Sequence, residues 1–203
     1  MFYGDMSTQV EFWFDASCPW TWITSRWLVE VAEARDLDIQ WKPFSLAVLN
    51  EDKDIPENYR EHVEEGRMGA QVAAGVAAEE GNETLGRFYE TLGRLYHSEG
   101  RVNDPIAISE ALTASGAAAD IMDRFADFED AVAESTHAGL ELVGDEVGVP
   151  IIAIDGVAFF GPVISPAPHG EDALRLWDGC LALAHTPGFF ELKRSRDVGP
   201  IFD

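Results

Sequence analysis

The sequence predicts an α/β fold in which a helical segment interrupts a small sheet. Three observations lead to this prediction: a strand–helix–strand pattern opens the chain, a long stretch of helical periodicity fills its middle, and strand signals return near its end. The 203 residues are enough for one globular domain, or for one domain that carries a sizeable insertion.

The opening unit is predicted from aromatic alternation and a well-placed proline. Residues 9–15 alternate in hydrophobicity with a period of two, which is typical of a partly buried strand. A helical pattern begins at Pro19 and runs to about Arg35. Proline is favoured at a first helical position because its missing N–H would have no partner there. Residues 38–46 then predict a second strand, which completes a βαβ unit.

The middle of the chain predicts helices only. From Pro56 to about Val147 the sequence is rich in Ala, Glu and Gly, with turn signals at Gly81 and Gly100. We therefore expect helices over 57–79, 83–98, 104–114, 118–126 and 127–144.

The last part of the chain predicts a β-hairpin and a helix. Two apolar runs, 149–154 and 157–160, flank Asp155-Gly156, a dipeptide typical of a two-residue hairpin turn. An amphipathic helix follows over about 170–185.

Taken in order, the predicted elements are βαβ, a run of helices, and then ββα. That is the order of a thioredoxin-like fold interrupted after its second strand by an all-α insertion. We expect residues 1–55 and 148–203 to form the thioredoxin-like domain and residues 56–147 to form the helical insertion subdomain. Such folds carry a cis-proline before the third strand, opposite the reactive residue. We therefore expect a cis Val149–Pro150 bond, with a backbone that positions a bound thiol.

The composition excludes several classes of partner. The chain has 37 Asp and Glu residues against 14 Lys and Arg residues, a formal net charge of −23. Such a polyanion is unsuited to nucleic acid and to anionic membrane surfaces, both of which attract clustered basic residues. The N-terminus has no leader pattern, no apolar run is long enough to span a membrane, and two cysteines are too few for a disulfide scaffold. We therefore expect a cytoplasmic protein in a reducing compartment.

Cys18 is the candidate nucleophile. It lies at the predicted junction between strand and helix, where a sulfur atom faces free N–H groups and the positive end of the helix dipole. Both favour thiolate over thiol, so we expect the pKa of Cys18 to lie below the usual value of about 8.5. A lone cysteine is more often an inert buried residue, but the adjoining strand, proline and aromatic residues favour a reactive one.

Thr21 stands where a C-x-x-C dithiol would need its second cysteine. Cys18 therefore cannot close a local disulfide, and an external thiol must resolve any mixed disulfide formed there. The Thr21 hydroxyl can donate a hydrogen bond to the thiolate, Trp20 and Thr21 shape the turn, and Pro19 begins the helix. Cys180 follows Trp177 in the last predicted helix, so we expect it to be a buried core thiol and no partner for Cys18.

Several stretches together resemble one protein family. FWFDASCPWTWITSRWLVEVA, SLAVLNE, PENYRE, GVPIIAIDGVAFFGPVIS and FFELKRSR closely resemble the actinobacterial mycothiol-dependent nitroreductases of the DsbA-like thioredoxin superfamily. The resemblance runs nearly end to end. It implies an oxidoreductase of DsbA-like fold that uses mycothiol, the low-molecular-weight thiol of actinobacteria, as thiol co-substrate. In that family the motif reads CPWC, so Cys18 matches the attacking cysteine while Thr21 departs from the second one.

The resemblance also implies which residues line the site. Trp20, Asn50 and Tyr59 match positions that line the cleft over the sulfur. An indole face suits a flat aromatic substrate, and an amide and a phenol can hydrogen-bond a nitro group or the polar parts of a thiol. The ordinary interpretations are a core residue for Trp20, a turn residue for Asn50 and a helix-surface aromatic for Tyr59.

No metal or flavin is predicted. The five histidines show no metal-ligand spacing, and the glycines form no phosphate-binding loop. The expected partners are a low-molecular-weight thiol and a small aromatic or disulfide substrate. The sequence is also compatible with a homodimer. Two other functions also stay open. One is a thiol S-transferase or isomerase of the kappa-class or chromene-carboxylate isomerase type, and the other is a non-catalytic binding or chaperone-like protein on a retired redox scaffold.

Overall fold

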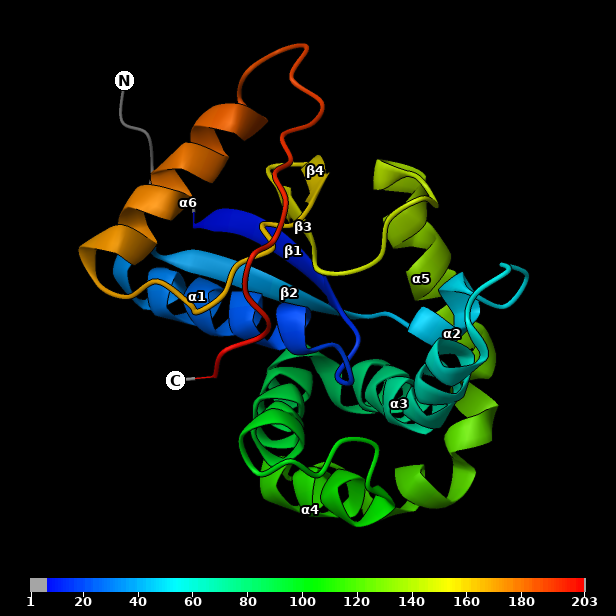
Figure 1. The fold of residues 1–203 in the computed structure, drawn as a ribbon. Coiled ribbons are helices and arrows are strands. Elements are labelled where there is room, and N and C mark those ends of the chain that lie inside the picture. Colours follow the sequence, from blue (N-terminus) through cyan, green and yellow to red (C-terminus); the bar gives the residue numbers. More distant parts are fainter. Residues whose placement is uncertain (1–6, 203) are drawn as a thin grey trace.

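A four-stranded sheet lies at the centre of residues 7–202, the part of the chain that this computed structural model describes (Figure 1). The strand order is β2-β1-β3-β4, formed by β1 (Thr8–Phe14), β2 (Leu37–Pro43), β3 (Ile151–Ile154) and β4 (Val157–Phe160). β1 is parallel to β2 and antiparallel to β3, and β3 and β4 form the predicted hairpin. The expectation about an N-terminal leader falls largely on residues 1–6, which lie outside the described residues.

Helices α1 (Pro19–Arg35) and α6 (Glu171–Ala184) pack against each other beside the sheet (Figure 1). The apolar face of α1 is buried, and Trp27 on it donates from Nε1 to the carbonyl of Ala173 at 3.0 Å. Its ring also lies 6.3 Å from that of Trp177. These contacts hold α1 against α6.

The second strand is shorter than predicted. The sequence favoured a strand over 38–46, but β2 ends at Pro43 and a short helix, α2 (Leu46–Leu49), follows. Ser45 caps this helix, because its hydroxyl accepts a hydrogen bond from the backbone N–H of Val48 at 3.3 Å. A proline that offers no N–H to a ladder and a serine cap two residues later stop the strand.

Between β2 and β3, every regular element among the described residues is helical. These elements are α2, α3 (Glu57–Gly93), the π-helical turn η1 (Arg94–Ser98), α4 (Pro105–Ser115), the 3₁₀ segment η2 (Ala119–Phe128) and α5 (Glu129–Val143). The predicted break near Gly81 is present, because Gly81 has φ 80° inside α3. The division of the chain at residues 56 and 147 into two domains stays a prediction.

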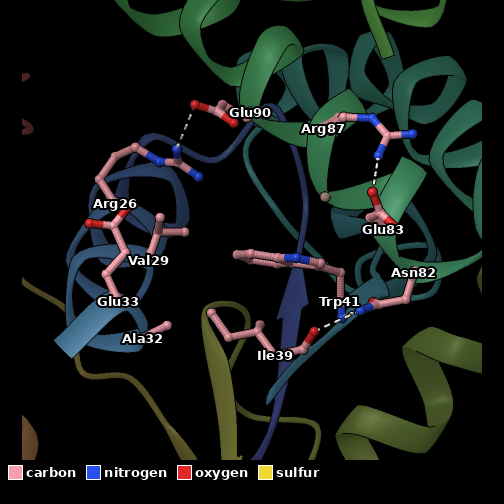
Figure 2. Close-up of a pocket in the computed structure, with 11 residues that line it drawn as sticks. Arg26, Val29, Ala32, Glu33, Ile39, Trp41, Asn82, Glu83, Arg87 and Glu90 are labelled. Atoms are coloured by element: carbon pink, nitrogen blue, oxygen red, sulfur yellow. Dashed lines mark hydrogen bonds and ion pairs between the residues drawn. The ribbon is translucent and has the colours of Figure 1, made fainter. Parts of the chain in front are cut away.

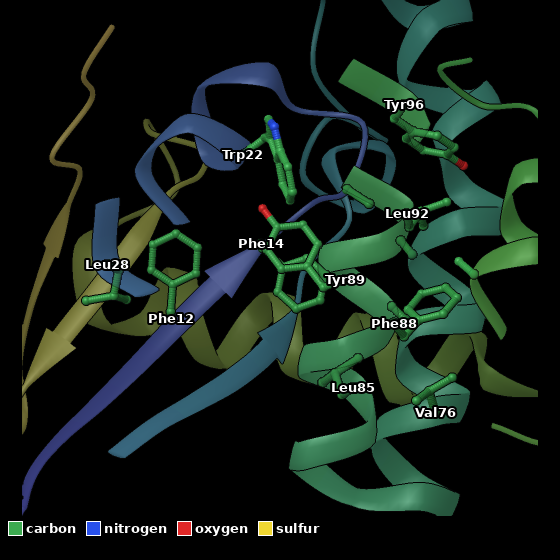
Figure 3. Close-up of a cluster of buried hydrophobic side chains, with 14 of the residues drawn as sticks. Phe12, Phe14, Trp22, Leu28, Val76, Leu85, Phe88, Tyr89, Leu92 and Tyr96 are labelled. Atoms are coloured by element: carbon green, nitrogen blue, oxygen red, sulfur yellow. The ribbon is translucent and has the colours of Figure 1, made fainter. Parts of the chain in front are cut away.

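The helical segment and the sheet share one hydrophobic core (Figure 3). Phe14 at the end of β1 stacks on Tyr89 of α3, with ring centroids 3.8 Å apart and an interplanar angle of 20°. Trp22 of α1 meets the same tyrosine edge-on at 5.8 Å. The chain is therefore anchored to α3 four residues before and four residues after Cys18, which fixes the turn that carries the sulfur.

Candidate active site

Cys18 lies where β1 gives way to α1. After β1 ends, the Cys18 N–H donates to the carbonyl of Asp15 at 3.0 Å, which closes a turn, and Pro19 begins the helix. Cys18 is thus the N-cap residue of α1, with φ −82° and ψ 112°. The sulfur stands at the positive end of the helix dipole, as the sequence predicted.

Val149 and Pro150 lie across from the Cys18 sulfur. The Val149–Pro150 bond is cis, as predicted, and the Sγ atom of Cys18 lies 3.8 Å from the carbonyl oxygen of Val149. β3 begins directly after Pro150, and its first residue, Ile151, pairs with Trp13 of β1. The antiparallel pairing therefore brings the backbone of Val149 to the sulfur.

A buried carboxyl group lies beneath the turn. Asp15 accepts hydrogen bonds from the Ser17 N–H at 2.9 Å, from the Ser17 hydroxyl at 2.7 Å and, through its other oxygen, from the Leu46 N–H at 2.8 Å. It ties the Cys18 turn to the start of α2. Burial raises the pKa of Asp15 even though these hydrogen bonds lower it. Sequence reasoning missed this residue, because an aspartate after a strand reads as an ordinary turn residue.

The expected low pKa of Cys18 is wrong. Burial is the largest effect and raises the pKa of Cys18, and the nearby Asp15 charge also raises it. Hydrogen bonds that the thiolate would receive from the Thr21 hydroxyl and from the backbone of Thr21 and Trp20 lower the pKa but do not reverse the direction. The side chain of Cys18 is only 8% exposed, so the loss of solvation outweighs the helix N-terminus.

Pro19, Trp20 and Thr21 form the first turn of α1. Thr21 is fully buried, and its hydroxyl has no hydrogen-bond partner in residues 7–202 while the sulfur is a thiol. It is available to donate once Cys18 ionises. Trp20 is half-buried, and the guanidinium of Arg196 lies over its ring with Cζ 4.8 Å from the ring centroid.

Asn50 and Tyr59 lie on the helical side of the site. Tyr59 near the start of α3 is 38% exposed, and its pKa is raised by burial and then by the neighbouring Cys18 and Asp15. The phenol is therefore close enough to sense the sulfur. Asn50 ends α2, is buried, and donates from Nδ2 to the carbonyl of Leu46 at 2.7 Å. One of its two amide N–H groups is therefore engaged within the chain, which agrees with the turn interpretation.

His97 supports the site from behind, and sequence reasoning gave it no role. It is buried, and its Nε2 lies 2.8 Å from the carbonyl oxygen of Ala16, in the turn before Cys18. Since a carbonyl only accepts, Nε2 carries the proton and donates. Burial lowers the pKa of His97 to about 4, so the ring is neutral at physiological pH. No local pattern could have revealed a contact across 81 positions.

The other cysteine lies elsewhere. Cys18 and Cys180 are both free, and Cys180 is partly buried against the core from α6. Burial raises the pKa of Cys180 to about 11. It was expected to be a buried core thiol, and the structure places it at intermediate exposure, packed against the core.

A hollow of about 420 Å³ lies away from the sulfur, between α1, β2 and α3 (Figure 2). Trp41 forms its floor, and Arg26 and Arg87 stand on opposite sides of it. None of the predicted site residues lines it. In the described part of the chain, no three His, Cys, Asp or Glu side chains are grouped to hold a metal ion, and no helix has the length and apolarity to cross a membrane.

Comparison with known proteins places the fold and the family. The chain resembles the probable DsbA oxidoreductase SCO1869 from Streptomyces coelicolor with a TM-score of 0.57 and 17% identity, over 95% of this chain and 97% of that one. It resembles the oxidoreductase DsbA from Xylella fastidiosa with a TM-score of 0.54 and 17% identity, over 88% and 86% of the two chains. These likenesses confirm the predicted thioredoxin-like, DsbA-like fold with its helical insertion.

Sequence comparison is more specific. The chain is 29% identical over 199 residues to Rv2286c, an uncharacterised protein of Mycobacterium tuberculosis, which covers 96% of this chain and 85% of that protein. Residues 17–194 match the Rv2466c-like family, described as mycothiol-dependent nitroreductase Rv2466c. Because this match spans most of the chain, including Cys18 and Pro150, the protein belongs to the Rv2466c-like family of mycothiol-dependent nitroreductases and is a thiol-dependent oxidoreductase.

Proposed function

We propose that the protein uses Cys18 as a monothiol nucleophile and that mycothiol supplies the electrons. One observation carries this proposal: the sulfur lies at the N-terminus of α1 and 3.8 Å from the carbonyl of Val149, the residue before cis-Pro150. A helix N-terminus stabilises an attacking thiolate, and a free backbone edge can align a bound thiol beside it. We place the reaction in the cytoplasm, where small thiols are kept reduced.

The first step is attack on a disulfide that carries mycothiol. A bond forms between the Cys18 sulfur and one mycothiol sulfur, the original S–S bond breaks, and the leaving thiolate takes a proton from water. A second mycothiol thiolate then attacks the mycothiol sulfur of this mixed disulfide. Mycothiol disulfide leaves, and Cys18 returns as a thiolate. Thr21 cannot take the place of that second thiol, and Cys180 lies in α6 with a pKa raised to about 11.

A nitroaromatic substrate would use the same electrons. Two mycothiols become one disulfide and give up two electrons and two protons, and the nitro group takes these up to become a nitroso group and one water. Trp20 offers an aromatic face for the ring, and the Tyr59 hydroxyl and the backbone of Val149 offer polar contacts. Asn50 contributes through its side-chain oxygen and its second amide N–H, since one of its two amide N–H groups already binds Leu46.

Thr21 is proposed to assist by hydrogen bonding. Its buried hydroxyl lacks a partner among the described residues while Cys18 is neutral, and it contributes to lowering the pKa of Cys18. Because the Thr21 hydroxyl finds an acceptor only in the charged sulfur, it stabilises Cys18 both as the attacking thiolate and as the leaving thiolate. Pro19 keeps the donor in place by fixing the first turn of α1.

The intact mass of the protein after brief exposure to mycothiol disulfide tests the proposal. We expect one mycothiol on the parent and on Cys180→Ser, none on Cys18→Ser, and release of the adduct by free mycothiol. No adduct on the parent, or an adduct that persists in Cys18→Ser, would contradict the monothiol mechanism. Thiol-transfer activity retained by Cys18→Ser would instead support the S-transferase alternative.

A further inference from the structure

The C-terminal segment lies against the candidate active site. Residues 189–202, here called the C-terminal strap, form no helix or strand and run from the end of α6 back past the sheet to the beginning of α1 (Figure 1). Ser165 holds the strap at two points, because its hydroxyl donates to the Gly199 carbonyl at 2.8 Å and accepts from the Ile201 N–H at 2.9 Å. The strap is thus fastened near the site although it has no regular structure.

The end of the strap reaches the scaffold of the Cys18 turn. The ring of Phe202 stacks on His97 with centroids 5.4 Å apart and an interplanar angle of 28°. His97 in turn binds the carbonyl of Ala16, two residues before Cys18. Earlier in the strap, Arg196 lies over Trp20, two residues after Cys18, with Cζ 4.8 Å from the ring centroid. The strap therefore contacts Trp20 just after the sulfur and, through Phe202, the histidine that supports the turn before it.

The strap is also the most basic stretch of an acidic protein. Lys193, Arg194 and Arg196 fall within four residues, whereas the whole chain has 14 basic residues against 37 acidic ones. None of these three side chains pairs with a carboxylate in the described part of the chain. Most basic side chains elsewhere do pair, as Arg101 does with Glu110 at 2.8 Å and Arg124 with Glu79 at 2.6 Å.

Unpaired cations are unexpected where carboxylates are so abundant. A net charge of −23 repels anions from the whole surface, so an anionic reactant needs a local cluster of positive charge to approach Cys18. The strap supplies such a cluster, because Lys193 and Arg194 lie within three residues of Arg196 and are exposed. The guanidinium of Arg196 is held by the Trp20 face and keeps its N–H groups free to bind an anion.

We propose that Arg196, with Lys193 and Arg194 beside it, makes the site select reactants that carry an anionic group, such as a carboxylate or sulfonate, next to the atom that Cys18 attacks. Arg196 is a specificity-determining residue: Trp20 holds an aromatic or apolar part of the reactant, and the guanidinium that lies over one face of the Trp20 ring binds the anionic part. This inference rests on the proposed reactivity of Cys18.

Paired alkylating reagents test the selection without any substrate. Iodoacetamide is neutral and iodoacetate is anionic, but both react in the same way: the Cys18 sulfur bonds to the methylene carbon, the carbon–iodine bond breaks, and iodide leaves. In a Cys180→Ser background Cys18 is the only thiol. The ratio of the iodoacetate rate to the iodoacetamide rate then reports the local charge, because the pKa of Cys18 affects both rates equally.

We expect Arg196→Gln to lower this ratio about threefold to tenfold at low salt, and added salt to shrink the difference between Arg196→Gln and the parent. Arg175→Gln is the matched control: it removes the same charge from the surface of α6, where Arg175 pairs with Asp172, and should leave the ratio unchanged. An unchanged ratio in Arg196→Gln, or an equal fall in Arg175→Gln, would overturn the proposal while leaving the reactivity of Cys18 intact. No reaction with iodoacetamide would overturn both this proposal and the proposed function.

Discussion

The Sγ atom of Cys18 lies 3.8 Å from the carbonyl oxygen of Val149, although 131 positions separate the two residues. Pairing of β1 with β3 makes this approach, since Trp13 lies opposite Ile151 at the end of the ladder. A carbonyl accepts from S–H but has no hydrogen to offer a thiolate. The contact therefore favours the neutral thiol, as burial does. Once the sulfur is ionised, the Val149 carbonyl is free to accept a hydrogen bond from an N–H of a bound thiol.

The buried carboxyl beneath the turn is expected to control the ionisation of Cys18. Asp15→Asn removes a negative charge whose presence raises the pKa of Cys18, so the pKa should fall. The pH dependence of iodoacetamide alkylation, measured in a Cys180→Ser background, would report this shift. The same change should cost about 1–3 kcal/mol of stability, because an amide cannot accept from both Ser17 and Leu46 as the carboxylate does.

Asp178→Asn is the control for that experiment. Asp178 is exposed on α6 and pairs with Arg35 at 3.2 Å, so its loss changes the net charge equally without touching the turn. An alkylation profile that shifts as far in Asp178→Asn as in Asp15→Asn would rule out a local effect of Asp15.

Acid should destabilise the protein through His97. The pKa of this histidine is about 4 in the folded chain, against a usual value of about 6.5, because burial disfavours the charged ring. The folded state therefore binds fewer protons than the unfolded state between these values. The contribution of His97 to stability is complete above pH 6.5 and falls by about 3 kcal/mol as the pH drops to 4.

Chemical denaturation at a series of pH values tests this. Between pH 6 and 5, the free energy of unfolding of the parent should fall about 1 kcal/mol more steeply than that of His97→Gln. His137→Gln, on the exposed side of α5, should keep the slope of the parent. Parallel slopes for the parent and His97→Gln would contradict a neutral buried imidazole.

The packing around Trp22 should not tolerate a methyl group added at Gly93 of α3. A Cβ added at Gly93 would lie 2.1 Å from Cε3 of Trp22, and that ring is confined by Tyr89 on one side and Arg26 on another. Gly93→Ala should therefore cost about 3 kcal/mol in the free energy of unfolding. Gly179→Ala, in α6 with no atom within 4 Å of its added Cβ, should gain about 0.5–1 kcal/mol. Equal effects of the two substitutions on thermal unfolding would contradict the close packing.

Local patterns predicted most of the elements, and long-range contacts account for the rest. The alternation in β1, the proline that begins α1 and the Asp155-Gly156 turn are each encoded within a few residues, and each is present. The pKa of Cys18 was predicted with the wrong sign because the sequence shows the helix N-terminus but not the burial of the sulfur. Asp15 and His97 escaped notice for the same reason, since their partners are defined only by the folded chain.

Two buried threonines in α1 should respond in opposite ways. The Thr21 hydroxyl has no partner in the described residues while Cys18 is neutral, whereas Thr24 donates from Oγ1 to the carbonyl of Pro162 at 2.8 Å. Thr21→Val should leave stability unchanged or raise it, because it removes a buried hydroxyl without a partner. It should also raise the pKa of Cys18 further, because the thiolate loses a donor.

Thr24→Val supplies the comparison within the same helix. It leaves the Pro162 carbonyl unpaired and should cost about 1–2 kcal/mol, while the alkylation profile of Cys18 stays that of the parent. Thermal unfolding and the pH dependence of iodoacetamide alkylation, both in a Cys180→Ser background, separate the two effects. If Thr21→Val destabilised the protein and left the alkylation profile in place, its hydroxyl would have a structural partner and no part in stabilising the thiolate. The opposite pattern, slower alkylation at a given pH in an equally stable protein, would assign Thr21 the donor role that a C-x-x-C motif leaves to its second cysteine.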